Sequence, residues 1–584
     1  MEIAKHRRHK YTGGVLFFCL PEKRKLHIDS TRPAVYVRQA LLLPRLVAFW
    51  NVSPFKRQRL CNSKLQRRRI IRMNRTSLSS RSGRNMSALF TLLFAIAIVF
   101  AMAVPANAQF TLVKISTDKF TNSDSVHRTE VEPDFFSWGN TIVGTFHVAR
   151  VPGSIGWGSA DVGWSTSTDG GKTWTYGILP ALTDKYKKGP YGWAADPSVA
   201  YDAKHGQWLI STLPLKNQEN SGTIGDVAVS RSPDGIHWGK PVIVDNTELD
   251  DKNWTTCDNT PTSPYYGNCY TEWDQAYGTG EVLMSTSHDG GLTWSAGIPS
   301  ADHATGLGAE PVVQPNGTVI VPFNGGGVDV FRSTDGGKSW STTVTAASFI
   351  THQDAGDIRT GFDLPGATID GAGRVYVVWS DCRFRSGCSS NDVVMSSSAD
   401  GKTWSAVSRI PIDPTKSTVD HFLPGIGADP ATSGSSAHLT IVYYYYPVSA
   451  CNSSCKLEVG FTTSTNGGKT WTAGKQLAGP MQLTWLPLSD AGYMVADYIG
   501  VTYTNGSPRG IFAVATAPTG ALLNEAMYTT KEPLLASVDE ARFSSKGEKP
   551  VHGAKADHEM KFYLDDEGRV PIPPSRLIPA QKQK

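Results

Sequence analysis

Acidic side chains recur at the start of a repeated segment of this chain, at intervals of about 53 to 68 residues. Carboxylates gathered in one place can bind a cation, hold a polar ligand or serve as an acid and a base. Like charges that close repel one another unless cations, water or N–H groups satisfy them. If the segments are equivalent, the acids form a ring. The seven are Glu132, Asp196, Asp251, Glu310, Asp363, Asp429 and Asp497.

A structural role for the ring is the alternative, and it is the one we favour. A residue repeated in every unit of a repeat protein usually answers a repeated structural need. Each carboxylate would then bond to the backbone of the neighbouring repeat. A structural cation such as calcium is the one metal we expect the ring to be able to hold, and no other cofactor is predicted.

Other side chains could line the same face as the acids. A surface ion pair is the commoner explanation for each charged member of this set. Tyr265 and Tyr266 lie in a long turn between two cysteines, where they could form an exposed platform for a ligand. The charged and histidine candidates are His147, Arg150, Arg359, Asp381, Arg383 and His421.

The repeat that positions these residues is a turn with a specific sequence. It reads Ser-x-Asp-x-Gly-x-x-Trp, with Asn for Asp in one copy and one residue fewer in two copies. Asp and Asn side chains accept hydrogen bonds from backbone N–H groups of a tight turn, and glycine supplies positive φ. We therefore assign these acids to the scaffold. The turn residues are Asp169, Asp234, Asp289, Asp335, Asp400 and Asn466.

We call the repeated Ser-x-Asp-x-Gly-x-x-Trp turn a box. Each acid is followed by a strand, a turn at glycine and a return strand, and then by the two strands that flank a box. Four strands repeated in this way predict an all-β propeller, a ring of sheets with few exposed edges. A seventh segment begins at Asp497 and has no box; 521–530 would be its third strand. The mature N-terminus, 110–117, would supply the fourth strand, which favours seven blades over six.

The ends of the chain differ from this body in composition. Residues 1–108 hold 21 Lys and Arg against three Asp and Glu, so the rest of the chain is acidic. An acidic body argues against nucleic acid as a partner, since phosphates would be repelled. The apolar run 88–104, after several arginines and before Ala106-Asn107-Ala108, predicts a signal peptide over 73–108 that is cleaved before Gln109. A membrane anchor is the alternative.

This signal predicts four regions and a secreted or periplasmic protein, with no stable membrane span after cleavage. Residues 1–72 form a basic extension that could reflect a misplaced start, and 109–534 form the propeller. Residues 535–584 are polar and rich in proline, which is typical of a flexible tail. Six body cysteines fall into three neighbouring pairs and predict local disulfides, each closing one small loop. The pairs are Cys257/Cys269, Cys382/Cys388 and Cys451/Cys455.

Boxes of this kind in an exported propeller resemble the sialidase-like, or BNR-repeat (Asp-box), superfamily over roughly 110–530. The resemblance implies three arginines that hold a substrate carboxylate, a Tyr–Glu nucleophile pair and an Asp acid/base. The first arginine belongs to an Arg-Ile-Pro string, yet the expected strand reads Val131-Glu132-Pro133-Asp134. The strand 141–150 has His147 and no Asp, and Arg409-Ile410-Pro411 follows the fifth box. No catalytic residue can be assigned.

We therefore predict an exported sialidase-like propeller that binds an extracellular glycan, polymer or protein at one mouth of its channel, without an intact sialidase catalytic set. The alternative is a glycoside hydrolase, exo-sialidase-like, with a nonstandard carboxylate pair. Such a pair must stand about 5 to 9.5 Å apart across an open cleft. The sequence does not indicate the oligomeric state.

Overall fold

The computed structural model describes residues 110–152, 157–216, 225–276, 278–535 and 541–551. The predicted basic extension and signal peptide, with Cys19 and Cys61, lie outside the described residues. The described chain is all-β, and its only helices are four short 3-10 turns at 386–388, 434–436, 452–454 and 483–485. No helix in this part of the chain is long and apolar enough to cross a membrane.

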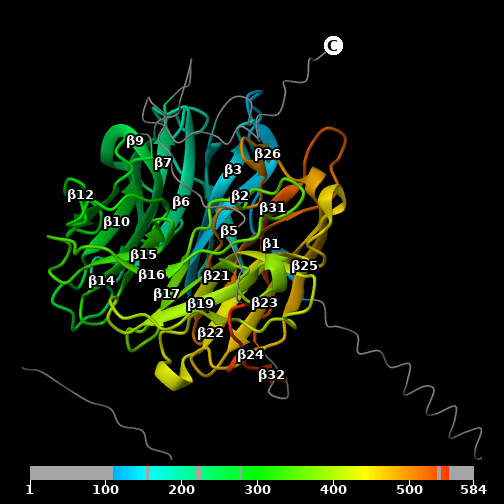
Figure 1. Ribbon diagram of the computed structural model, residues 1–584. Coiled ribbons are helices and arrows are strands. Elements are labelled where there is room, and N and C mark those ends of the chain that lie inside the picture. The colour runs from blue at the N-terminus through cyan, green and yellow to red at the C-terminus, as the bar shows by residue number, and fades with distance from the viewer. Residues whose placement is uncertain (1–109, 153–156, 217–224, 277, 536–540, 552–584) are drawn as a thin grey trace, which may run out of the picture. The chain divides into compact units, whose positions relative to one another are not determined.

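Most strands pair in antiparallel groups of four made by consecutive segments of the chain (Figure 1), and the first three groups are joined into one eleven-stranded sheet. One of the joins is a single pair, Ser159 opposite Ala194. The first group is β2 (Val126–Trp138), β3 (Thr141–Arg150), β4 (Ser159–Ser167) and β5 (Thr175–Ile178). The second is β6 (Trp193–Asp202), β7 (Gln207–Leu215), β8 (Gly225–Ser232) and the first half of β9 (Val242–Cys257).

The long strand β9 joins two groups, because its second half pairs with the next strand along the chain. That third group continues with β10 (Cys269–Asp274), β11 (Val282–Ser287) and β12 (Ile298–Pro299). The fourth contains β13 (Val312–Val313), β14 (Val319–Asn324), β15 (Gly327–Ser333) and β16 (Val344–Ser348). The fifth contains β17 (Gly366–Ile369), β18 (Val375–Asp381), β19 (Asp392–Ser398) and β20 (Ser408–Arg409).

The sixth group is β21 (Asp420–Ala428), β22 (Leu439–Tyr446), β23 (Lys456–Ser464) and β25 (Lys475–Gln482). The hairpins β26 (Leu488–Ser489) and β27 (Gly492–Tyr493), then β28 (Val501–Thr504) and β29 (Ser507–Gly510), follow it. The last sheet is β30 (Phe512–Ala515), β31 (Glu525–Thr530) and, from the other end of the body, β1 (Leu112–Lys114). The pairing of 110–117 with 521–530 that the sequence predicts is confirmed, with Val113 opposite Thr529.

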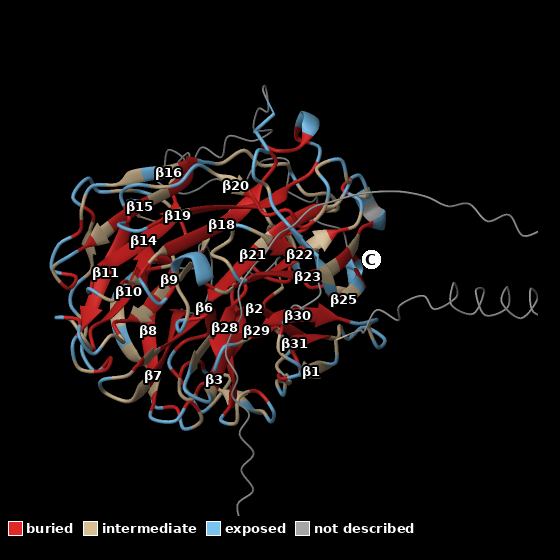
Figure 2. Cartoon of the chain, turned by 90° about the horizontal axis from the view of Figure 1, so that it is seen from below, coloured by how far each residue is buried: buried red, intermediate tan, exposed pale blue. Residues whose placement is uncertain are grey.

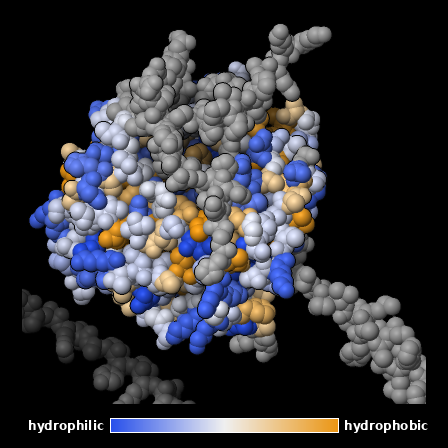
Figure 3. Space-filling model, viewed as in Figure 1, coloured by the Kyte–Doolittle hydropathy of each residue, from blue (hydrophilic) through white to orange (hydrophobic). Residues whose placement is uncertain are grey.

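The first strand of each group lies beside the first strands of the groups before and after it. β2 contacts β6, and β28 contacts both β21 and β2, so the last segment adjoins the first. Apolar side chains between the groups form the core, and Figure 2 shows buried residues along the strands and exposed residues in the turns. The face seen in Figure 3 carries mostly hydrophilic residues with apolar ones interspersed.

The box turns have the hydrogen bonds that their sequence predicts. In the third box the Asp289 carboxylate accepts bonds from the backbone N–H of Leu292 (3.0 Å) and Thr293 (2.9 Å). The Ser287 hydroxyl accepts one from the N–H of Gly291 (2.9 Å), a residue with φ of +79°. In the sixth box the Asn466 side-chain oxygen accepts the corresponding bond from the N–H of Thr470.

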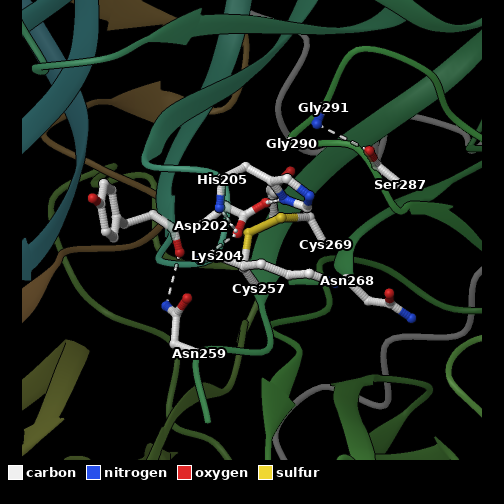
Figure 4. The surroundings of a disulfide bond; sticks show 12 residues. Asp202, Lys204, His205, Cys257, Asn259, Asn268, Cys269, Ser287, Gly290 and Gly291 are labelled. Carbon is white, nitrogen blue, oxygen red and sulfur yellow. Dashed lines mark hydrogen bonds and ion pairs between the residues drawn. A yellow bond between two sulfur atoms is a disulfide. The ribbon is translucent and has the colours of Figure 1, made fainter. Parts of the chain in front are cut away.

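All three predicted disulfides are present. Cys257–Cys269 closes the loop between β9 and β10 (Figure 4), where the Asn259 amide donates to the backbone carbonyl of Tyr201 (2.8 Å). This contact ties the loop to the preceding group of strands. The other two bonds close the loop between β18 and β19 and the loop between β22 and β23. They are Cys382–Cys388 and Cys451–Cys455.

Cys388 and Cys455 are buried in the core in addition to closing a small loop. Cys388 is 4% exposed, has a φ of +51°, and its Sγ atom lies 3.7 Å from the backbone carbonyl oxygen of Thr351. Cys455 is 2% exposed and belongs to a hydrophobic cluster, with its Sγ atom 2.8 Å from the carbonyl oxygen of Asn452. A disulfide sulfur has no hydrogen to donate, so both are packing contacts. These two cysteines are therefore core residues as well as loop closures.

Part of the predicted tail also packs on the body. The strand β32 (Arg542–Phe543) pairs with β24 (Trp471–Thr472), which follows the sixth box. Phe543 stands opposite Trp471 in this pairing. The tail thus begins as an added strand beside the sixth group.

Replacing Asp289 with alanine removes the acceptor of two backbone N–H groups and of the Thr293 hydroxyl. We expect D289A to lower the free energy of unfolding by about 1 to 2 kcal/mol. The isosteric D289N should lose much less, since asparagine already fills this place in the sixth box. Urea unfolding of both variants measures the difference, and equal stability of D289A and the wild type would contradict the assigned role.

Candidate functional site

A backbone irregularity in the first strands aims selected side chains toward one another. Five non-glycine residues in or just before these strands have positive φ between 44° and 51°, and a register shift accompanies those in β2, β6, β9 and β21. Such bulges bend a strand and re-aim its side chains, which is why they recur beside functional sites. The five residues are Glu132, Asp196, Lys252, Asp363 and Leu423.

One lysine joins three of the predicted acids. The Lys252 Nζ atom lies 2.6 Å from Asp497 Oδ2, 3.3 Å from Asp196 Oδ1 and 3.9 Å from Glu132 Oε1. Its side chain is only 5% exposed. Burial alone would lower the pKa of Lys252, but the facing carboxylates raise it well above its ordinary value. The ammonium is therefore charged. It supplies the positive charge among the acids that the sequence analysis expected from a metal cation.

An arginine from outside the repeated strands reinforces this contact. Arg359 donates from Nε to Asp497 Oδ1 and from Nη2 to Asp497 Oδ2, both at 2.7 Å, and from Nη1 to Asp490 (3.2 Å). This is the forked geometry in which arginine binds carboxylate most strongly. Against the effect of burial, Arg359 and Lys252 hold the pKa of Asp497 far below its usual range.

A histidine also links Glu132 and Asp196. His147 Nε2 lies 3.0 Å from Glu132 Oε2 and accepts the backbone N–H of Asp196 at 2.8 Å. Burial raises the pKa of Glu132, and the neighbouring Asp196 and Asp497 add to the increase. The pKa of His147 is raised too, because the two carboxylates outweigh its burial. His147 thus brings Glu132 and Asp196 into one buried polar cluster.

A small cavity adjoins the charged cluster of Glu132, His147, Asp196, Lys252, Arg359 and Asp497, which we call the central network. Arg150, Asp251 and Asp490 line it with members of the network, and its volume is about 20 Å³. This is space for about one water molecule. Arg150 is 5% exposed. Burial and the nearby Arg359 lower the pKa of Arg150.

Two further buried acids were missed by the sequence analysis. Glu272 and Asp274 lie on β10 and are fully buried, and the Asp274 carboxylate accepts the N–H of Gly308 (3.2 Å). Burial raises the pKa of both well above the ordinary value, and nearby acids add to the increase. No repeat marks them, so only their place opposite Asp251 and Trp254 in the sheet could reveal them.

Some buried side chains bond to the backbone of the next group, as the structural alternative proposed. Asp134 accepts the N–H of Val199 (2.7 Å), and Ser198 accepts that of Thr255 (3.0 Å). Glu310 accepts the N–H of Ala367 (2.8 Å). Two members of the predicted ring have this role, because Asp196 also accepts the N–H of Lys252 (3.3 Å). The sequence analysis did not single out Asp134 or Ser198.

The predicted seven-membered ring needs correction. Asp429 follows the end of β21 and caps the turn to β22 by accepting the N–H of Ala431, so it lies at the far end of that strand. The bulge residue there is Leu423, and in the third group it is Lys252 and not Asp251. Asp363 has the same positive φ as the bulge residues, but its carboxylate accepts a hydrogen bond from the Thr351 hydroxyl (3.3 Å), outside the network.

The other predicted ligand-binding residues are mostly engaged with the protein itself. Arg383 forms a forked pair with Asp381, at 2.8 and 2.7 Å. His421 is buried against the rings of Tyr443 and Tyr445, and burial lowers its pKa. His147, Arg150 and Arg359 are those that meet at the central network and its cavity.

The predicted tyrosine platform is not freely exposed. Tyr265 is half-buried, its hydroxyl donates to the carbonyl of Thr334 in the fourth box, and Gly336 lies under its ring. Tyr266 is half-buried as well. Their loop follows Cys257 at the end of β9, whereas Asp251 lies earlier in that strand. These tyrosines are therefore not at the central network.

Two groups of residues could hold a metal ion by spacing, and arginine or lysine lies in each. Ligand atoms of Glu132, His147 and Asp196 fall within 4.8 Å of one another, next to Lys252. The second group is Asp392, Asp413 and His421. There, two buried guanidiniums contact both carboxylates at 2.5 to 2.8 Å. These belong to Arg385 and Arg409, so the arginine of the Arg-Ile-Pro string is part of an ion-pair cluster.

No family model and no curated protein sequence matches the chain. Among solved structures, a protein of unknown function from Dyadobacter fermentans is 16% identical and covers 62% of this chain and 100% of its own, with a TM-score of 0.40. A mutant NanB sialidase from Streptococcus pneumoniae is 14% identical, covers 74% and 72%, and has a TM-score of 0.37.

An ulvan lyase of family PL25 bound to -[GlcA(1-4)Rha3S]- is 13% identical, covers 75% of this chain and 100% of its own, and has a TM-score of 0.42. The chain is thus similar to sialidases and to this lyase at low identity. Its own sheets and box turns carry the fold assignment, and its function must be argued from its own side chains.

Removing the charge of Lys252 should destabilise the protein strongly. K252M leaves three buried carboxylates without their shared cation, and we expect a loss of about 3 to 5 kcal/mol in the free energy of unfolding. The matched control is K338M, at an exposed lysine of the fourth box, which should change stability by less than about 0.5 kcal/mol. Equal effects of the two substitutions in urea unfolding would contradict the account.

Stability should also fall as pH rises from about 5 to 8. Burial raises the pKa of Asp134 and Asp363 to about 7 and that of Glu130 to about 8. In the unfolded chain these groups titrate near pH 4, so over this range the folded state binds more protons and loses stability as pH increases. Urea unfolding at pH 5 and pH 8 checks the sign, and D134N should flatten the slope.

Proposed function

We propose that the chain is an exported, seven-bladed Asp-box propeller that binds an extracellular glycan without hydrolysing it. Seven blades are supported by the segment after the sixth box, in which β28, the β29–β30 segment, β31 and β1 run side by side. The N-terminal strand β1 would thus complete the last blade. The propeller would occupy 109–534, with 535–584 as the C-terminal extension.

Export rests on the predicted signal peptide before Gln109, which lies outside the described residues. The three disulfides support it, because such bonds persist in oxidising compartments outside the cytoplasm. We infer a secreted or periplasmic protein from these two features together.

The observation that carries the proposal is the closed state of the central network. A glycoside hydrolase needs two carboxyl groups facing a sugar across an open cleft. Here Asp196 and Asp497 are bound by Lys252, Asp497 also by Arg359, and Glu132 by His147. Each of these acids is at most 4% exposed, and the adjoining cavity holds about one water molecule. This arrangement supports a scaffold that fixes the blades at the channel mouth.

A glycan is the ligand class that the sequence resemblance implies and that the outer surface supports. Aromatic side chains suit sugar rings because they offer a flat apolar face with polar groups at its edge. An open hollow of about 740 Å³ is lined by several aromatic side chains near β5. A volume of this order accommodates a drug-sized or larger ligand, whereas the cavity at the network does not.

A polysaccharide panel tests binding and hydrolysis together. The secreted protein, with disulfides intact, is run in affinity gels that contain neutral, carboxylated or sulfated polysaccharides, and reducing-end release is measured in the same mixtures. We expect retarded migration on at least one polymer and no release of reducing ends. Release that disappears in the E132Q variant would overturn the proposal in favour of a hydrolase, and no retardation on any polymer would refute glycan binding.

A further inference from the structure

An open hollow in the described surface lies along the outer strand of the first group, away from the central network. Its walls come from β4 and β5, from 117–122 near the N-terminus, from 185–187 before β6 and from the second box turn, 236–238. Its volume is about 740 Å³. We call it the β5 groove.

Two lysines reach over tyrosine rings in this groove. The Lys119 Nζ atom lies 5.6 Å from the centre of the Tyr176 ring, and the Lys187 Nζ atom lies 5.3 Å from that of Tyr186. An ammonium within about 6 Å of an aromatic face is weakly attracted to it, which keeps the charge beside the ring. Tyr176 is 41% exposed, so its ring remains accessible.

These two ammonium groups have no carboxylate partner within 4 Å among the described residues. The acids around the groove are engaged elsewhere. Lys185 binds both Asp184 (2.8 Å) and Asp124 (3.6 Å). Asp234 is used by its own box turn and by His237 Nδ1 (2.6 Å). The groove thus keeps two uncompensated positive charges beside two tyrosines.

The positive charge of the groove is a local feature. Beyond residue 108 the chain has 49 acidic against 36 basic residues, but many of these acids are buried in the core, among them Asp196, Glu272 and Asp497. An uncompensated cationic groove selects anions locally. Tyrosine faces beside the cations suit a sugar ring that carries the anionic group.

We propose that the β5 groove binds an anionic polysaccharide. The Tyr176 and Tyr186 rings pack against sugar rings, and Lys119 and Lys187 pair with the carboxylate or sulfate groups of the polymer. This proposal rests on the proposed glycan binding and adds its site and the chemical class of the ligand. A neutral polymer would gain nothing from the two lysines.

The test compares polygalacturonate, dextran sulfate and dextran as ligands of the mature protein in affinity gels and calorimetry. We expect binding to at least one of the two charged polymers, with dextran at least tenfold weaker. The preferred charged polymer distinguishes carboxylate from sulfate. Because the lysine contacts are electrostatic, binding should weaken as salt increases.

Variants locate the site. K119A/K187A should weaken binding to the charged polymer about tenfold or more, and Y176A should weaken it while Y176F keeps it. The matched control is K338A/K402A, which removes two exposed box lysines away from the groove and should leave affinity unchanged. Thermal unfolding confirms that all four variants are folded.

Three results would overturn the inference. These are equal binding of dextran, unchanged affinity of K119A/K187A, and failure of both charged polymers to bind. None of them alone refutes glycan binding as the function, because that conclusion fails only if the wider polysaccharide panel shows no binding.

Discussion

A buried ammonium group holds the centre of this molecule together. Lys252 lies among the carboxylates of three other strand groups, and each of these acids would be costly to bury alone. Arg359 completes the neutralisation by its forked contact with Asp497. Because the two cations bridge segments from β2, β6, β9 and the chain before β28, they fix the spacing of the innermost strands. The four-stranded groups can then pack around this fixed centre.

This constraint separates the roles of the two polar regions. At the centre, charges are paired, buried and next to a cavity of about 20 Å³, so they serve the scaffold. On the outer side of the first group, Lys119 and Lys187 stand beside tyrosines in an open groove of about 740 Å³, so they remain available to a ligand. Compensated charge is thus buried at the centre and uncompensated charge lies on the outside, as the proposed binding of an anionic glycan requires.

Local features of this fold were readable in the sequence, whereas most long-range features were not. The box turns and the disulfides were predicted because each is closed by residues within about twelve positions of one another. The burial of Cys388 and Cys455 was not, since it depends on segments that pack over their loops. The pairing of 110–117 with 521–530 followed from an unmatched strand at each end.

The sequence singled out every member of the central network except Lys252, and that lysine and the groove escaped prediction. An acid fills the bulge in β2 and β6, but lysine and leucine fill it at 252 and 423, so no single residue type marks it. Asp429 was misassigned because its Asp-Pro pair resembles a strand start, although its strand begins at Asp420. The walls of the β5 groove come from five separate segments of the chain, which no local pattern connects.

The D497N variant tests most directly whether the central network is scaffold. Its substitution removes the charge that Lys252 and Arg359 share. The measurement pairs its free energy of unfolding with its affinity for the polysaccharide that the wild type binds best. The account predicts a clear loss of stability, with affinity unchanged at temperatures where the variant is folded. Unchanged stability together with lost binding, or with lost hydrolysis of that polymer, would show instead that the network is the ligand site.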